Sequence, residues 1–155
     1  MEIYKPPSFI RELDLSKSLF LGGSIENGKA DDWQKEIEIA LKDDEGIILN
    51  PRRDDWDSGW IQSKDNPQFK SQVKWELFGL EHCKIIVMYF QPGTKSPISL
   101  LELGLHVKSE KLLVCCPKGY MKKGNVDITC AYYGVPVVET FDELVTSIKY
   151  IVTSN

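Results

Sequence analysis

The seven residues KIIVMYF, at positions 84–90, carry the strongest β-strand signal in the chain. Their apolar side chains do not alternate with polar ones, which is typical of a central parallel strand that is covered on both faces. Before and after them, shorter apolar runs alternate with segments that have the apolar spacing of helices. Strands that alternate with helices predict a parallel sheet with right-handed crossover connections.

Four further strands and at least four helices are predicted around this central strand. The other strands are SLFLGG (18–23), GIILNP (46–51), KLLVCCP (111–117) and VPVVE (135–139). The helices cover residues 30–43, 67–83, 97–110 and 140–152, and residues 121–134 are ambiguous, with a short helix as one interpretation. Thr140 is a candidate N-cap, with Glu143 at the spacing of a capping box. The pattern predicts an α/β, three-layer flavodoxin-like or Rossmann-like sandwich with a five-stranded parallel sheet.

The composition is that of a single globular domain. The chain has 155 residues, of which 42% are hydrophobic and 27% charged, and we expect one domain over residues 1–155, with residues 1–17 as a polar lead-in. A net charge of −4 provides no basic field for a nucleic acid polymer. The N-terminus has no apolar signal region and no run approaches about 18 apolar residues, so we expect no membrane segment and a cytoplasmic location.

The four cysteines lie mostly inside apolar runs and lack the spacing of a metal site. They are Cys83, Cys115, Cys116 and Cys130, and the chain has only two histidines. Buried, reduced thiols are the simplest interpretation. We therefore expect neither a metal nor another cofactor.

Polar residues and glycines follow three of the predicted strands, at the edge where folds of this class bind ligands. A glycine turn lets a ligand approach the backbone, arginines bind phosphate or carboxylate groups, and acids or tryptophans can contact a sugar or a base. A structural turn and a solvated charged loop are the alternatives. The candidate ligand-binding residues are Gly22, Gly23, Ser24, Asn50, Arg52, Arg53, Asp54, Asp55, Trp56 and Ser96.

The stretch SLLELGLHV, at positions 99–107, places the carboxyl of Glu102 inside an apolar run. Glu102 lies about one and a half helical turns after Pro97, close to the expected ligand edge. An acid half screened from water there has a raised pKa unless another group holds it ionised. A carboxylate in such a cleft can act as the nucleophile of glycosyl transfer. Glu76, in KWELFGL, has the pattern of a surface glutamate.

The segments FLGGSIENG, KWELFGLEHCKIIVMYF and SPISLLELG occur in this order within residues 18–116. Together they resemble the nucleoside 2-deoxyribosyltransferase family and its relatives, the 2'-deoxynucleoside 5'-monophosphate N-glycosidases. The resemblance implies a flavodoxin-like fold and catalysis by Glu102, which would attack the anomeric carbon and expel the base. It places Glu76 at a catalytic position where the family commonly has Asp. It also implies a homo-oligomer in which a neighbouring subunit completes the site.

The resemblance leaves the substrate and the acceptor open. Six residues before Glu102, transferases usually have an Asp that helps to protonate the leaving base, whereas the glycosidases have a Ser that contributes to phosphate binding. This chain has Ser96 there, and Asp54 or Asp55 can supply a base contact instead. Our first hypothesis is deoxyribosyl transfer between a nucleoside or nucleotide and a free nucleobase. The alternatives are hydrolysis of 2'-deoxynucleosides or their 5'-monophosphates, and a nucleotide-binding module without turnover.

Overall fold

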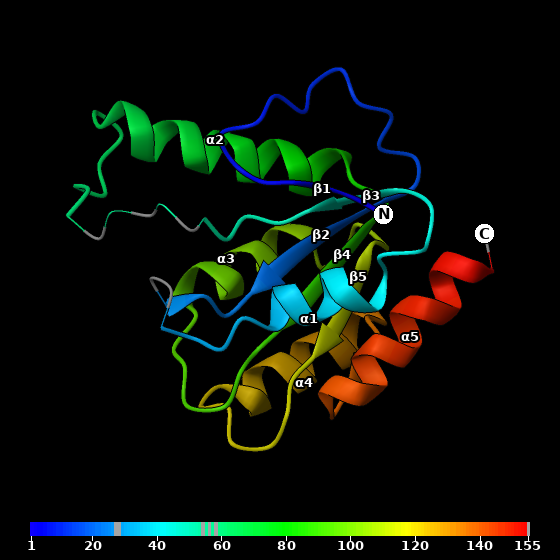
Figure 1. Cartoon of the computed structure of the whole chain (residues 1–155). Coiled ribbons are helices and arrows are strands. Elements are labelled where there is room, and N and C mark those ends of the chain that lie inside the picture. The colour runs from blue at the N-terminus through cyan, green and yellow to red at the C-terminus, as the bar shows by residue number, and fades with distance from the viewer. Residues whose placement is uncertain (27–28, 54, 56, 58, 155) are drawn as a thin grey trace.

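The computed structural model describes residues 1–26, 29–53, 55, 57 and 59–154, and its sheet is all-parallel (Figure 1). The strands run in the order β1-β3-β2-β4-β5-β6. Their bounds are β1 Glu2–Tyr4, β2 Ser18–Gly23, β3 Ile47–Leu49, β4 Ile85–Tyr89, β5 Leu112–Cys115 and β6 Val137–Val138. Apart from β1, this is the strand order of a flavodoxin-like sheet, so the predicted fold class is confirmed.

The sheet has six strands among the described residues, and the prediction of five was wrong. Residues 1–17 were expected to be a lead-in, but Glu2–Tyr4 pairs in parallel with β3, Tyr4 lying opposite Leu49. The strand is short and lies at the edge, so only one neighbour fixes it, and Ile3 is 43% exposed. A three-residue edge strand needs no buried apolar pattern, and no such pattern marked it in the sequence.

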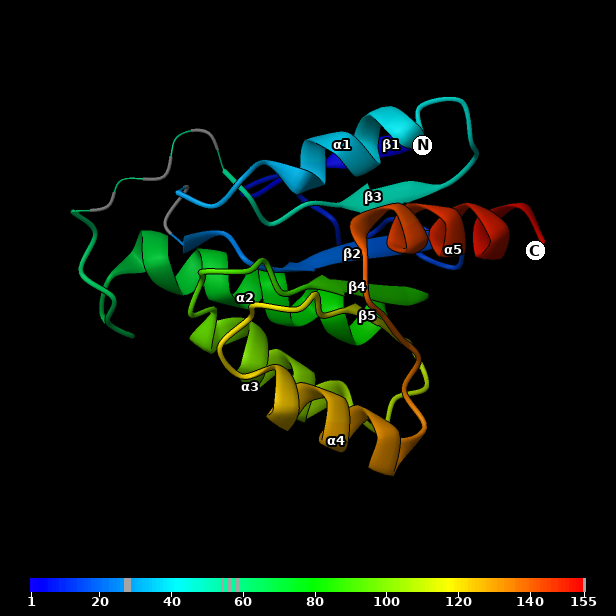
Figure 2. The same ribbon diagram turned by 90° about the horizontal axis from the view of Figure 1, so that it is seen from below.

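In the part of the chain that the structure describes, five helices cover the two faces of the sheet. They are α1 Trp33–Ala40, α2 Pro67–His82, α3 Pro97–His106, α4 Lys123–Tyr133 and α5 Phe141–Thr153. Helices α1 and α5 lie on one face, and α2, α3 and α4 on the other (Figure 2). The ambiguous segment 121–134 therefore contains a helix, and the capping box of Thr140 and Glu143 is confirmed.

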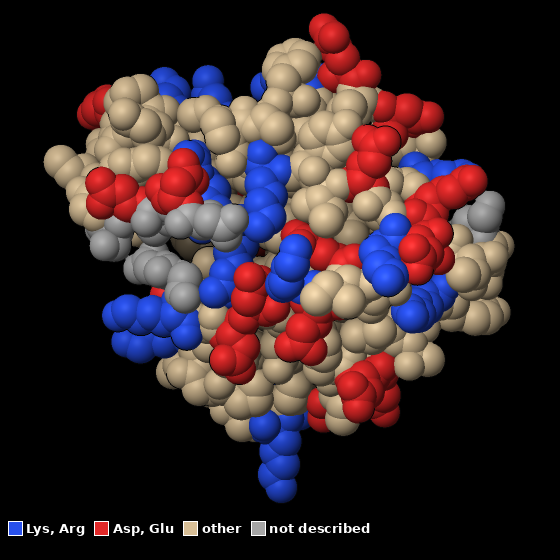
Figure 3. Space-filling model, in the orientation of Figure 1, with Lys and Arg blue, Asp and Glu red and all other residues tan. Residues whose placement is uncertain are grey.

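The two faces of the sheet bury separate apolar clusters, one under each helical layer. Phe20 and Met88 point toward α2 and α3, whereas Leu21 and Val87 point toward α1 and α5. All four cysteines are buried and free, as expected from their apolar surroundings. Among the described residues, no helix is long and apolar enough to span a bilayer. The face seen in Figure 3 mixes acidic and basic side chains without a continuous field of either sign.

Candidate active site

The carboxyl ends of β2, β3 and β4 meet at one edge of the sheet, and the loops that follow them carry the predicted ligand residues (Figure 1). Gly23 ends β2 with a φ of +125°, and a Cβ there would lie 2.3 Å from the carbonyl oxygen of Tyr89. Gly23 therefore lets β2 and β4 approach closely at this edge. A Cβ at Gly22 would make only ordinary contacts, 3.5 Å from Met88.

Three buried hydroxyl groups meet where these loops begin. The Oγ of Ser24 lies 2.6 Å from the Oγ of Ser96 and 2.8 Å from the Oγ1 of Thr94, and the last two are 3.0 Å apart. The backbone N–H of Gln91 also donates to Ser24 Oγ at 2.9 Å. The structure thus brings together two residues that the sequence predicted, Ser24 and Ser96. It adds Thr94, which the sequence did not indicate because its role depends on contacts with a distant loop.

Glu26 joins the loop after β2 to the start of α3. Its Oε1 accepts hydrogen bonds from the backbone N–H groups of Lys95, at 2.9 Å, and Ser96, at 2.7 Å. Ser96 is the N-cap residue of α3, but it has a left-handed backbone and makes no capping bond with its own side chain. Sequence reasoning missed this role of Glu26, and the only available signal was an acid in a glycine turn.

Asn50 and Arg52 are engaged in contacts within the protein. The Nδ2 of Asn50 donates to the buried Glu38 at 2.7 Å, and its Oδ1 accepts from the backbone N–H of Arg52. The guanidinium group of Arg52 donates to the carbonyl oxygens of Ala30 and Asp31, both at 2.8 Å. These contacts hold the β2–α1 connection against the end of β3.

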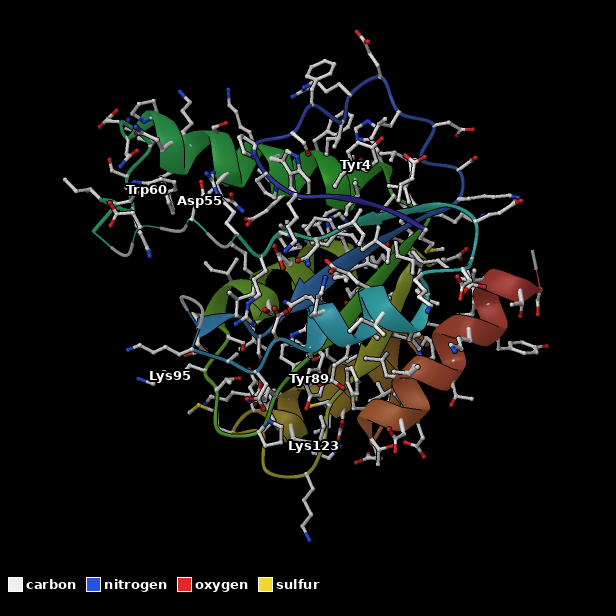
Figure 4. The ribbon with its side chains drawn as sticks, in the orientation of Figure 1. Tyr4, Asp55, Trp60, Tyr89, Lys95 and Lys123 are labelled. Atoms are coloured by element: carbon white, nitrogen blue, oxygen red, sulfur yellow. The ribbon has the colours of Figure 1, made fainter. Side chains whose placement is uncertain are left out.

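Arg53 forms a two-pronged ion pair with Asp55. The two hydrogen bonds measure 2.8 and 2.7 Å, and the guanidinium group lies 5.1 Å from the ring centre of Trp60. The ion pair raises the pKa of Arg53 and lowers that of Asp55. Asp55 and Trp60 lie near each other in the β3–α2 connection (Figure 4). The predicted residues Asp54 and Trp56 lie outside the described residues.

Glu102 faces the interior of the protein, on the inner side of α3. It is 8% exposed, and burial, followed by the negative charge of Glu76, raises its pKa from 4.5 to about 8. Burial also raises the pKa of Glu76 to about 7, against a hydrogen bond from Gln72 that lowers it. Two nearby carboxyls in such surroundings do not both ionise readily at neutral pH. Glu76, interpreted from its sequence pattern alone as a surface residue, is half-buried and accepts a hydrogen bond from Gln72.

Two buried polar atoms among the described residues have no hydrogen-bond partner, and both lie near this edge. The Nε2 of Gln72 donates to Glu76 at 2.7 Å and to the carbonyl oxygen of Pro51 at 3.1 Å, but its Oε1 accepts nothing. The Nε2 of Gln34 is also without a partner. Buried polar atoms without partners are uncommon in folded proteins, and a bound ligand or water can satisfy them.

Residues 16–120 match the model of a family described as nucleoside 2-deoxyribosyltransferase like. The chain belongs to this family. The matched span runs from just before β2 to just after β5, and it includes Glu76, Glu102 and the hydroxyl groups around Ser24. Membership of the nucleoside 2-deoxyribosyltransferase-like family confirms the resemblance found in the sequence, and it points to a nucleoside-acting enzyme.

A solved structure supports the fold of this family member. The chain is similar to a conserved protein from Enterococcus faecalis V583, with a TM-score of 0.61 and 12% sequence identity. The similarity covers 86% of this chain and 98% of the other, and at this identity it shows the fold alone. A comparison with curated proteins gives no match.

Two cavities among the described residues of this family member are not lined by Glu102. One, of about 540 Å³, is lined by residues such as Met1, Lys17 and Ile151. Another, of about 480 Å³, lies between α2 and α3 and is lined by Phe78 and His106, among others. The described residues also contain no group of three His, Cys, Asp or Glu side chains that can hold a metal ion. We therefore define the candidate site by the carboxyls of Glu76 and Glu102 and by the hydroxyls around Ser24, and not by the volume of a cavity.

Proposed function

We propose that this protein is a nucleoside 2-deoxyribosyltransferase that moves a 2-deoxyribosyl group between nucleobases through a covalent intermediate on Glu102. The observation that carries the proposal is Glu102 itself, a carboxyl that is 8% exposed on the inner side of α3 and whose pKa is raised by burial and by the charge of Glu76. Burying an acid without an ion pair is expensive, and such acids concentrate at functional sites. The family match over residues 16–120 supports the same chemistry.

The reaction has two displacement steps at the anomeric carbon. The Glu102 carboxylate forms a bond to C1' while the bond from C1' to the base nitrogen breaks, and the base leaves with the bonding electrons and takes up a proton. A nitrogen of the second base then attacks C1' and gives up its proton, and the carboxylate of Glu102 leaves. Negative charge at Glu102 stabilises the oxocarbenium-like transition state of each step.

The role proposed for Glu76 follows from its coupling to Glu102. Attack requires an ionised Glu102, but burial and the charge of Glu76 favour its protonated form. Glu76, which accepts a hydrogen bond from Gln72, has the lower pKa of the two and ionises first, so its negative charge keeps the proton on Glu102 until the pH approaches about 8. Glu76 would therefore set the charge of the nucleophile.

Hydrolysis of the N-glycosidic bond is the second candidate, and Ser96 is the observation that favours it. In the resemblance described above, the glycosidases have a Ser at this position. Here the hydroxyl of Ser96 forms hydrogen bonds with the hydroxyls of Ser24 and Thr94. None of these three side chains is an acid that can protonate a leaving base near neutral pH. Water would then take the place of the second base.

Product analysis separates these functions. Deoxyinosine or thymidine is incubated with free adenine or cytosine, and the products are resolved by chromatography. New deoxynucleoside supports transfer, free base alone supports hydrolysis, and saturable binding without turnover would contradict both. The intact mass of the protein should rise by one sugar during turnover. Glu102→Gln should abolish both turnover and the added mass, whereas Glu110→Gln, an exposed residue just after α3, should keep them.

The partner proposed for the outer side of α3 is a second copy of this chain. Ile98, Leu101 and Leu105 form an apolar stripe there, and each is 59% exposed. Large apolar side chains grouped on one face are typical of interaction surfaces. The homo-oligomer implied by the family resemblance would cover this stripe, and it would place a second subunit on the helix that carries Glu102.

A further inference from the structure

We propose that Gln72 is a positioning residue of the candidate site. Its side-chain amide, oriented by the carbonyl of Pro51, holds negative charge on Glu76 and thereby keeps the proton on Glu102. The inference rests on the proposed chemistry at Glu102, and it adds the residue that decides which of the two carboxyls ionises first. In this role Gln72 acts through Glu76 and not on the reacting atoms.

Two neighbours determine which way the amide of Gln72 points. Its Nε2 donates to the carbonyl oxygen of Pro51 at 3.1 Å and to the Oε1 of Glu76 at 2.7 Å. A backbone carbonyl can only accept, so the contact with Pro51 requires the NH2 end of the amide on this side. Turning the amide over would place two acceptors face to face. The Oε1 of Gln72 therefore points elsewhere, and among the described residues it accepts no hydrogen bond.

In this orientation Gln72 can only donate to Glu76. A hydrogen bond donated to a carboxyl group favours the ionised form, and here it lowers the pKa of Glu76 against the effect of burial. Gln72 is 4% exposed, so water competes little for the bond. Burial and the charge of Glu76 both favour the protonated form of Glu102. The first negative charge of the pair is therefore placed on Glu76, and the proton stays on Glu102.

Charged and titratable groups on the surrounding elements do not reverse this order. The two arginines that follow Pro51 donate to backbone carbonyls of the β2–α1 connection and to an aspartate of their own loop. Arg11, in the segment before β2, lies over an aromatic ring of α2, 4.7 Å from its centre. His106, one turn after Glu102 on α3, is buried, which lowers its pKa and favours the neutral ring. The charge that raises the pKa of Glu102 is that of Glu76.

The test follows the ionisation of each carboxyl in the protein without substrate. Glutamates labelled with carbon-13 are observed by NMR as the pH is raised, and Glu76→Gln and Glu102→Gln assign the two signals. Gln72→Met keeps the length of the side chain but removes the donor. Loss of a hydrogen bond to a charged group corresponds to about one to two pKa units, so Glu76 should ionise at a pH higher by about this amount.

The same change should let Glu102 ionise at lower pH, because Glu76 then carries less charge at any given pH. The shift of Glu102 should not exceed the shift that Glu76→Gln causes. The increase of kcat/KM for transfer with pH should move down together with the titration curve of Glu102.

Two controls separate this role from a general loosening of the site. Gln68→Met changes an exposed residue one turn earlier on α2, and it should leave both titration curves unchanged. In a Glu76→Gln background, Gln72→Met should move the curve of Glu102 no further, because the charge through which Gln72 acts is gone. Gln72→Leu also removes the donor, and it replaces Gln72→Met if that variant does not fold.

Two results would overturn the inference while leaving the proposed function intact. They are an unchanged Glu102 curve in a folded Gln72→Met protein, and a shift of equal size in the Glu76→Gln background. If the curves move as expected but neither transfer nor hydrolysis is detected at any pH, the role of Gln72 is supported and the proposed function is contradicted.

Discussion

Replacing Glu102 by glutamine should make the protein more stable at alkaline pH, although the change removes the proposed nucleophile. Burial, together with the charge of Glu76, raises the pKa of Glu102 from 4.5 to about 8. A carboxyl with a higher pKa in the folded state binds its proton more tightly there than in the unfolded chain. The stability that Glu102 contributes is therefore complete below pH 4.5 and is lost as the pH rises through about 8.

The expected gain follows from the size of this pKa change. One pKa unit corresponds to 1.36 kcal/mol, so a rise from 4.5 to about 8 sets a ceiling of roughly 5 kcal/mol at pH 9. Glutamine has nearly the same shape and carries no charge, but burying its amide without a full set of partners costs about 1–3 kcal/mol. We expect a net gain of about 2–4 kcal/mol at pH 9 and little or no gain at pH 5.

Urea unfolding at pH 5, 7 and 9 measures this difference. The wild type and Glu102→Gln are compared with Glu110→Gln, which removes an exposed carboxyl just beyond α3 and should follow the wild-type curve. Equal slopes of unfolding free energy against urea would show that the variants unfold to similar extents. If the stability of Glu102→Gln stays parallel to that of the wild type from pH 5 to pH 9, Glu102 does not carry a raised pKa in the folded protein and the reasoning fails.

Three further predictions concern the edge of the sheet, the coupled carboxyls and the outer side of α3. Gly23→Ala should destabilise the fold by more than about 3 kcal/mol in thermal unfolding, because its Cβ would lie 2.3 Å from a backbone oxygen, whereas Gly104→Ala, with nothing within 4 Å, should change stability by about 1 kcal/mol or less. The wild-type kcat/KM for transfer should increase with pH up to about 8 as Glu102 ionises, and Glu76→Gln should move this increase to lower pH, because the charge of Glu76 raises the pKa of Glu102. Leu101→Glu should lower the mass measured by light scattering to that of a monomer, and an unchanged mass would exclude this stripe as the contact between copies.

The central strands could be predicted from the sequence because burial on both faces leaves a continuous apolar run. Residues 84–90 and the strand that ends at Gly23 show this, and their elements are β4 and β2. The edge strand β1 could not be predicted, because its pairing is fixed by β3, more than forty residues away in the chain. Helix α4 was ambiguous for a related reason. Its inner side contributes few buried residues, Val126 and Cys130, and its periodicity is correspondingly weak.

The candidate site was predictable where a residue contradicted its local pattern and unpredictable where its role depends on distant partners. Glu102 stood out because a carboxyl interrupts an apolar helix. Glu26 and Thr94 did not stand out, since their roles come from hydrogen bonds between loops about seventy residues apart. Arg52 was predicted as a ligand contact from its position, but its guanidinium group donates to two backbone carbonyls. The sequence of a charged loop does not reveal whether its charged side chains bind a ligand or form hydrogen bonds within the protein.

Helix α3 buries several polar side chains and exposes several apolar ones, which is the opposite of the usual arrangement. This arrangement connects the candidate site with the proposed contact between two copies of the chain. Its inner side buries Ser99, Glu102 and His106, while Leu101 and Leu105 lie mostly exposed on its outer side. A helix free to rotate would bury the leucines, since each contributes roughly 1.5–3 kcal/mol when fully buried. The Glu26 cap and the buried Leu103 hold the helix in its observed orientation. A second copy on the outer side would recover part of the lost burial without moving Glu102. If two copies pair in this way, their separation should expose Leu101 and Leu105 again while Glu102 keeps its place on the inner side of α3.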